Sequence, residues 1–153
     1  MRAALAAASI RGAATILVAC NAARAEGRAL LIAPAPGPEV LAGSTRLKAG
    51  TATKLVLNTL TTASMTRLGK VYGNRMVDLQ PRSAKLRARA ERLVTEIAGV
   101  GSARARRVLR GARGNVRVAI VMARRNLPAD AAARALRAAG GSLRSVLERP
   151  SAR

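Results

Sequence analysis

The sequence predicts a mixed α/β region over residues 1–80, followed by a small all-α region over residues 81–153. Two short aliphatic runs in the first region are typical of parallel strands. A proline-rich segment and a long helical segment follow them, which is the order expected of an α/β fold. Beyond residue 81 the segments have helical periodicity and are separated by glycines, as in a bundle of short helices.

The first aliphatic run admits two interpretations. Residues 13–20, AATILVAC, resemble the apolar part of a secretion signal ending at Cys20, but Arg11 shortens that run to about eight residues. The alternative is a helix over residues 3–11, a stop at Gly12 and a buried strand over residues 15–20. We favour the strand, because β-branched residues in a short apolar run fit a strand covered on both faces.

A second run, residues 29–33, predicts another buried strand. Prolines at 34, 36 and 38 end it, since proline cannot continue a hydrogen-bonded ladder. No stretch of the sequence approaches the roughly 18 apolar residues of a membrane-spanning helix. The chain is therefore not expected to cross a membrane.

Helical periodicity begins again at residue 54 and lasts to residue 68, where Gly69 supplies a stop. Residues 68–80 are expected to form a connector. The all-α region is then expected to contain helices over residues 86–98, 103–112, 115–125, 129–139 and 142–147.

An internal repeat lies in the all-α region. Residues 107–120 align with residues 134–147, and six of the fourteen positions are identical. Each copy reads as a helix, a glycine turn, a capping residue (Asn115 or Ser142) and the start of the next helix. The pattern resembles ubiquitin-associated domains, and helix packing is its simplest explanation.

Composition excludes several kinds of site. The chain has no histidine and a single cysteine, so a His/Cys metal site and Ser-His or Cys-His nucleophilic pairs are not expected. We expect neither a metal nor another cofactor. One cysteine also leaves no internal disulfide, which suits a reducing compartment.

The chain is strongly basic, with 28 Lys and Arg against seven Asp and Glu and a net charge of +21. Residues 82–153 hold 18 of these basic residues. Such a charge attracts phosphorylated metabolites and nucleic acid, although arginine can also replace lysine and glutamine on solvated helices for compositional reasons. Tyr72 is the only aromatic residue, so the stacking platforms of specific single-strand binding are missing and no specific nucleic-acid partner is expected.

The candidate site is the loop that follows the second strand. It contains one carboxylate, Glu39, two hydroxyls, Ser44 and Thr45, and two cations, Arg46 and Lys48. Hydroxyls, backbone N–H groups at a helix start and cations together predict a phosphate or sugar-phosphate site. The alternative is that Ser44 caps the helix while the two cations face water.

This loop also carries a family resemblance. Residues 37–58, GPEVLAGSTRLKAGTATKLVLN, resemble the signature shared by N-acetylmuramic acid 6-phosphate etherases and glucokinase regulatory protein. Residues 12–21, 63–79 and 114–122 resemble the stretches that flank that signature in the family. The resemblance therefore covers nearly the whole chain and corresponds to the C-terminal half of the family.

The resemblance implies a partial flavodoxin-like sugar isomerase (SIS) domain over residues 1–80 and a ubiquitin-associated-like domain over residues 81–153. It implies a cytoplasmic homodimer that binds a sugar phosphate and works without a metal. The family is a group of carbon-oxygen lyases that cleave the D-lactyl ether of N-acetylmuramic acid 6-phosphate. The products are N-acetylglucosamine 6-phosphate and D-lactate, in amino-sugar catabolism and peptidoglycan recycling.

The chain departs from the family in length. The part without a counterpart is the N-terminal half, which in the family carries the main phosphate loop and both catalytic glutamates. The carboxylates before Asp130 do not suggest an acid and a base on one substrate; they are Glu26, Glu39, Asp78, Glu91 and Glu96. We therefore expect no catalytic residue here, and a truncated or split protein that is inactive alone. The alternatives are a non-enzymatic sugar-phosphate-binding regulator and a basic nucleic-acid-binding protein.

Overall fold

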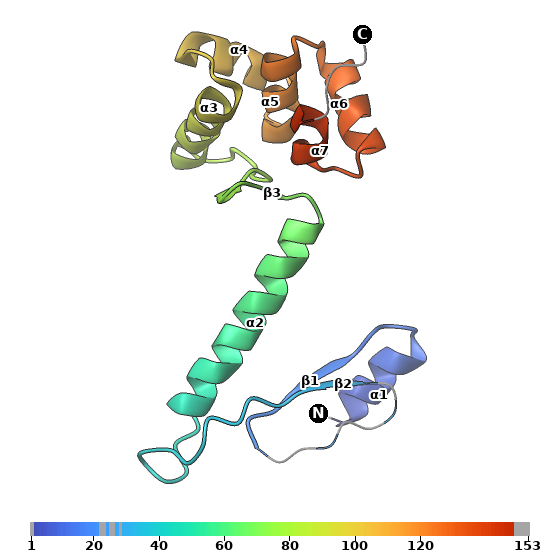
Figure 1. Ribbon diagram of the computed structural model, residues 1–153, viewed down its shortest axis with the longest axis vertical. Helices are drawn as coiled ribbons and strands as arrows, with labels where there is room; N and C mark the ends of the chain where they lie inside the picture. Colours follow the sequence, from blue (N-terminus) through green and yellow to red (C-terminus); the bar gives the residue numbers. More distant parts are fainter. Residues whose placement is uncertain (1, 22–23, 25–26, 28, 149–153) are drawn as a thin grey trace. The chain divides into compact units, whose positions relative to one another are not determined.

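The computed structural model describes residues 2–21, 24, 27 and 29–148 (Figure 1). The chain divides into two compact units, Met1–Thr62 and Ala63–Arg153. The division falls inside a long helix, and the assignment of residues 1–80 and 81–153 to two family domains stays a prediction. Glu26 and the last five residues of the second predicted domain lie outside the described residues.

The first unit contains helix α1 (Arg2–Ile10), strands β1 (Ile16–Val18) and β2 (Leu30–Ile32), and most of helix α2 (Lys48–Arg67). The two strands pair in parallel, with Leu17 opposite Leu31. A helix followed by two parallel strands is the order that the sequence predicts, and Gly12, at φ +76°, follows the first helix as expected. The mixed α/β character of this region is thus confirmed.

The strands are less buried than their composition predicts. Ile16 is 42% exposed and Leu30 is 59% exposed, so the expectation of strands covered on both faces is wrong for the described part of this unit. Within the described residues this sheet has two strands. A pair of three-residue strands cannot shield both of its own faces, because burial of a parallel sheet requires helices packed on each side.

Helix α2 begins at Lys48, well before the predicted start at residue 54. The first turns contain three residues of low helix propensity, Gly50, Thr51 and Thr53. For this reason the helical pattern of the sequence becomes recognisable only after them. The C-terminal end agrees with the sequence, since Gly69 adopts φ +69° beyond the last turn. None of the residues of α2 is buried.

The second unit begins with a small antiparallel hairpin that the sequence did not indicate, β3 (Val71–Tyr72) paired with β4 (Arg75–Met76). The predicted helices follow with shifts of one or two residues at their ends. Their bounds are α3 (Ala84–Ala98), α4 (Ser102–Gly111), α5 (Val116–Arg125), α6 (Ala129–Ala138) and α7 (Leu143–Glu148).

Helix α5 lies at the centre of this unit and contacts α3, α4, α6 and α7 (Figure 1). Six of its residues are buried, including the fully buried Ile120. Tyr72 and Leu79 from the segment before α3 also pack against this core. The single aromatic side chain is therefore partly buried in the second unit.

The internal repeat is confirmed as a repeated turn. Asn115 Oδ1 accepts a hydrogen bond from the Val118 N–H at 3.1 Å, and Ser142 Oγ accepts one from the Ser145 N–H at 3.2 Å. The two residues before each cap have positive φ: +50° and +79° at Arg113 and Gly114 in the first copy, and +60° and +81° at Gly140 and Gly141 in the second. Both copies therefore build the same capped turn, as the sequence predicts.

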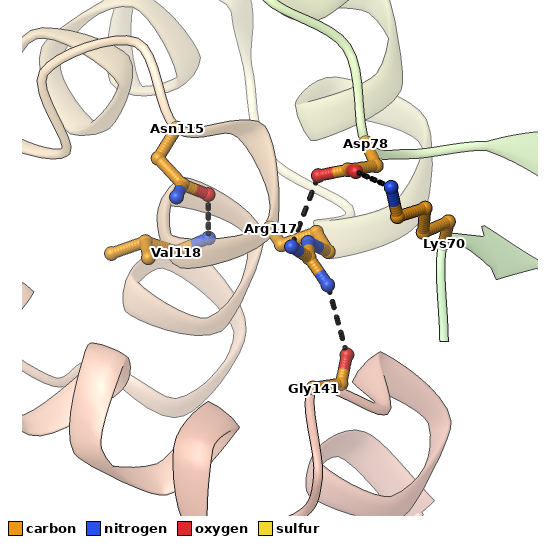
Figure 2. A network of polar contacts seen from close by, with 6 residues as sticks. All are labelled: Lys70, Asp78, Asn115, Arg117, Val118 and Gly141. Carbon is orange, nitrogen blue, oxygen red and sulfur yellow. Dashed lines mark hydrogen bonds and ion pairs between the residues drawn. The ribbon is translucent and has the colours of Figure 1, made fainter. Parts of the chain in front are cut away.

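A network of polar contacts ties the hairpin segment to the helices (Figure 2). Asp78 accepts from Lys70 Nζ at 3.2 Å and from Arg117 Nη2 at 3.0 Å. Arg117 Nη1 also donates to the Gly141 carbonyl at 3.2 Å. A Cβ added at Gly69 would lie 2.8 Å from that same carbonyl oxygen, so Gly69 and Gly141 approach each other too closely for any side chain at residue 69.

Candidate functional site

The predicted site residues lie in a loop that leaves β2 and returns to the start of α2. Cys20, just beyond the carboxyl end of β1, lies 3.4 Å from both the Ala49 carbonyl and the Thr53 hydroxyl in the first turns of α2. The start of α2 is therefore beside the carboxyl end of the parallel strand pair. This is the edge at which ligands bind in open α/β sheets.

Glu39 caps helix α2 from nine residues away. Its carboxylate accepts hydrogen bonds from the backbone N–H groups of Lys48 and Ala49, both at 2.9 Å. The bond from Ala49, followed by that from Lys48, lowers the pKa of Glu39 from its usual 4.5. Bonds donated to the ionised form favour that form, so Glu39 is an anion that already occupies two donors of the helix start.

Ser44 and Thr45 lie in the turns that precede α2. The Ser44 N–H donates to the Leu41 carbonyl at 3.0 Å and the Thr45 N–H to the Gly43 carbonyl at 3.1 Å. Within the described part of the chain neither side-chain hydroxyl has a hydrogen-bond partner. Ser44 therefore does not cap α2, and both hydroxyls are available to a ligand.

Arg46 and Lys48 are both exposed. The Lys48 ammonium lies 3.7 Å from the position that a Cβ would take at Gly37, so the lysine folds back over the start of the loop. Arg46 has no ion-pair partner among the described residues. The structure thus brings Glu39 and Lys48 together at the helix start and leaves Ser44, Thr45 and Arg46 on the adjoining turn.

Sequence reasoning did not assign Cys20 or Thr53 to this region. Cys20 and Thr53 join the end of β1 to α2, and the Thr53 hydroxyl donates to the Ala49 carbonyl at 2.8 Å. The position of Cys20 at the carboxyl end of a predicted parallel strand is the signal that could have placed it here. Thr53 carried no such signal, because a threonine bonded to the carbonyl four residues earlier is common in helices.

Comparison with known proteins finds curated relatives that match most of this chain. The chain is 48% identical over 141 residues to an N-acetylmuramic acid 6-phosphate etherase of Brucella anthropi, a match covering 89% of this chain and 45% of the relative. The etherase of Mycolicibacterium smegmatis is 49% identical over 138 residues, covering 89% and 46%. The chain is similar to these etherases over most of its own length.

The etherase of Geobacillus thermodenitrificans gives a comparable match, 48% identity over 139 residues, covering 90% of this chain and 47% of that protein. The chain thus spans about half the length of the curated relatives it matches. No protein-family model matches the chain. In the part of the chain that the structure describes, no helix is long and apolar enough to span a membrane.

Proposed function

We propose that this chain forms part of the sugar-phosphate site of an N-acetylmuramic acid 6-phosphate etherase. The observation that carries the proposal is the similarity to etherases over about nine tenths of the chain. The loop at the carboxyl edge of β1 and β2 supports it, because free hydroxyls and exposed cations there suit a phosphate ester. The first unit would then be part of a flavodoxin-like sugar isomerase domain.

In this proposal Arg46 is the main phosphate contact and Lys48 adds a point charge. A planar guanidinium binds a phosphate through two parallel hydrogen bonds, whereas an ammonium group does not. Ser44 and Thr45 donate their hydroxyls to the same phosphate. Glu39 fixes the helix start and the backbone of Lys48, so it positions the site.

We further propose that the chain does not cleave the ether by itself. Elimination of lactate requires an acid and a base on one substrate. Among the described carboxylates before Asp130, Asp78, Glu91 and Glu96 form ion pairs with arginine and Glu39 holds the start of α2. The acid and base would come from polypeptide that corresponds to the unmatched part of the relatives.

The first experiment replaces the matching 141 residues of the Brucella anthropi etherase by this chain. The chimaera is expected to release D-lactate from N-acetylmuramic acid 6-phosphate, while the isolated chain is not. Arg46→Ala in the chimaera should raise KM, and Lys54→Ala, which removes an exposed cation further along α2, is the matched control. A correctly folded chimaera without D-lactate release would contradict the proposal.

A second measurement separates catalysis from binding alone. N-acetylglucosamine 6-phosphate and inorganic phosphate are titrated into the isolated chain at physiological salt. Preference for the sugar phosphate, lost in Arg46→Ala and kept in Lys54→Ala, would show a formed site in the chain. Together with an inactive chimaera, that preference would favour the non-enzymatic sugar-phosphate-binding alternative.

A further inference from the structure

The helical unit contains a cavity that the proposed function does not use. It lies between α3, α4 and the turn before α5, and its volume is about 560 Å³, within the range of roughly 300–1,000 Å³ typical of small-molecule sites. Pro81 and Leu109 form its apolar part. Gly114 also lines the cavity, and a Cβ at this residue would lie 3.1 Å from Pro81 Cγ.

The residues that line this cavity carry an excess of positive charge. Four arginines line it, from α3 (Arg87), α4 (Arg106 and Arg110) and the turn before α5 (Arg113), against the single carboxylate of Glu91. Glu91 is already engaged, because it accepts from Arg106 Nη1 at 2.8 Å.

The guanidinium groups of Arg87, Arg110 and Arg113 have no carboxylate partner among the described residues. All three side chains are exposed, so they are free to turn toward a ligand. A concave surface lined by unpaired charges of one sign focuses the electrostatic potential on an ion of opposite sign.

The internal repeat provides a comparison within the same chain. Arg113 adopts φ +50°, whereas its counterpart in the second copy is Gly140, at φ +60°. Positive φ is uncommon for residues other than glycine and is a source of backbone strain. The same turn is thus built with glycine in one copy and with a strained arginine in the copy that lines the cavity.

We propose that this cavity binds a small molecule with two or more phosphate groups. Guanidinium groups bind phosphate oxygens bidentately, and the charge of three unpaired guanidinium groups exceeds the charge of about −1.5 to −2 that a single phosphate group carries near pH 7. The apolar floor of Pro81 and Leu109 accommodates the body of the ligand. A nucleic acid suits the site less well, because the only aromatic side chain, Tyr72, packs against the core and does not line this cavity.

Inorganic pyrophosphate is the probe, titrated into the full chain by calorimetry at physiological salt beside inorganic phosphate. Pyrophosphate should bind more tightly than phosphate. Arg110→Gln should weaken binding roughly tenfold, the usual loss for one charge-assisted contact. The control is Arg137→Gln, which removes the same charge from the equivalent position of the second copy and should leave the affinity within about twofold.

Arg113→Gly sharpens the test because its two effects have opposite signs. It should weaken pyrophosphate binding as Arg110→Gln does, yet raise the melting temperature by a few degrees through relief of the strained φ. A binding loss accompanied by a lower melting temperature would mean that the arginine is structural and would overturn its assigned role.

Three other outcomes would overturn the proposal. Equal losses in Arg110→Gln and Arg137→Gln would show attraction by the overall charge of the chain. Equal affinities for pyrophosphate and phosphate would show that the cavity does not recognise two phosphate groups. A short DNA duplex that binds in preference to pyrophosphate, with equal sensitivity to both variants, would identify nucleic acid as the partner.

Discussion

The two units of this chain differ in how far they bury their apolar side chains. Every buried apolar residue among those described lies at or beyond Val77, in the second unit. The first unit instead leaves most of its large aliphatic side chains exposed: Ile10, Ile16, Leu30, Val40, Leu41, Leu47, Leu55 and Leu57. The second unit can therefore be stable by itself, while the first unit, which carries the candidate sugar-phosphate loop, lacks a core of its own.

The difference in burial between the two units follows from their architectures. A bundle of short helices buries its apolar faces within a contiguous segment, since each helix contacts its neighbours in sequence. A parallel sheet is completed only by strands and helices on both sides. A surface with this many exposed aliphatic residues also favours association, and we expect the first unit to be oligomeric or poorly ordered in isolation.

The largest expected effect tests the core of the second unit. Ile120→Ala should lower the free energy of unfolding by about 2–5 kcal/mol, because it leaves a cavity beside the fully buried centre of α5. Tyr72 packs against this core, so its near-ultraviolet circular dichroism reports on the second unit during denaturation with guanidinium.

The matched change in the first unit is Leu55→Ala, at a residue that is 62% exposed. It should change the free energy of unfolding by less than about 0.5 kcal/mol. A loss as large as that of Ile120→Ala would mean that α2 is covered in solution, and would remove the contrast between the units.

A smaller effect is expected from the network around Asp78. Asp78→Asn weakens the ion pairs with Lys70 and Arg117, and should destabilise the second unit by about 1–2 kcal/mol, given that the Asp78 side chain is 31% exposed. Glu148→Gln is the control, because its pair with Arg144 is more exposed and should contribute little. Equal losses in both variants, measured by the same denaturation, would refute a special role for the network.

The caps of the repeated turn should contribute about equally. Asn115→Ala and Ser142→Ala each remove one side-chain acceptor at a helix start, and each should cost about 1 kcal/mol. Thermal unfolding of the two variants measures the difference directly. A negligible effect in Ser142→Ala alone would show that α7 frays without loss to the rest of the unit.

The smallest effect concerns the start of α2 and depends on pH. Because the folded state lowers the pKa of Glu39 below its usual 4.5, its capping contribution is present above that value and is lost as the pH falls through the lowered pKa. The amide proton shifts of Lys48 and Ala49 in NMR spectra should therefore change below about pH 4.5. Glu39→Gln should abolish that change; its persistence would contradict the capping role.

Helical periodicity and the positions of the glycines predict helices α3 to α7 to within two residues at their ends. Local signals suffice for most of these boundaries, because Asn115, Ser142 and the glycines mark them in adjacent residues. The hairpin at residues 71–76 was missed, since two-residue strands leave no alternation to recognise. The exposed state of Ile16 and Leu30 could not be read from composition, which records how apolar a strand is and says nothing of what covers it.

The candidate site shows the same limit. Residue types near the start of α2 predict a phosphate site, and Ser44, Thr45, Arg46 and Lys48 do lie on one short segment. The capping of α2 by Glu39 depends on a turn that brings together residues nine positions apart, and helix-capping rules cover only neighbouring residues. The contact of Cys20 with α2 is longer in range still and follows only from the strand topology.

The close approach of Gly69 and Gly141 limits which substitutions this sequence can tolerate. Residue 69 meets backbone atoms within 3.0 Å, so even alanine there would push two chain segments apart. Gly140, one residue from Gly141, has open space around it, and the first repeat already accepts Arg113 at the equivalent position. Gly69 is therefore held by crowding as well as by its backbone angle, whereas Gly140 is held by its backbone angle alone, and substitutions should accumulate first at residue 140.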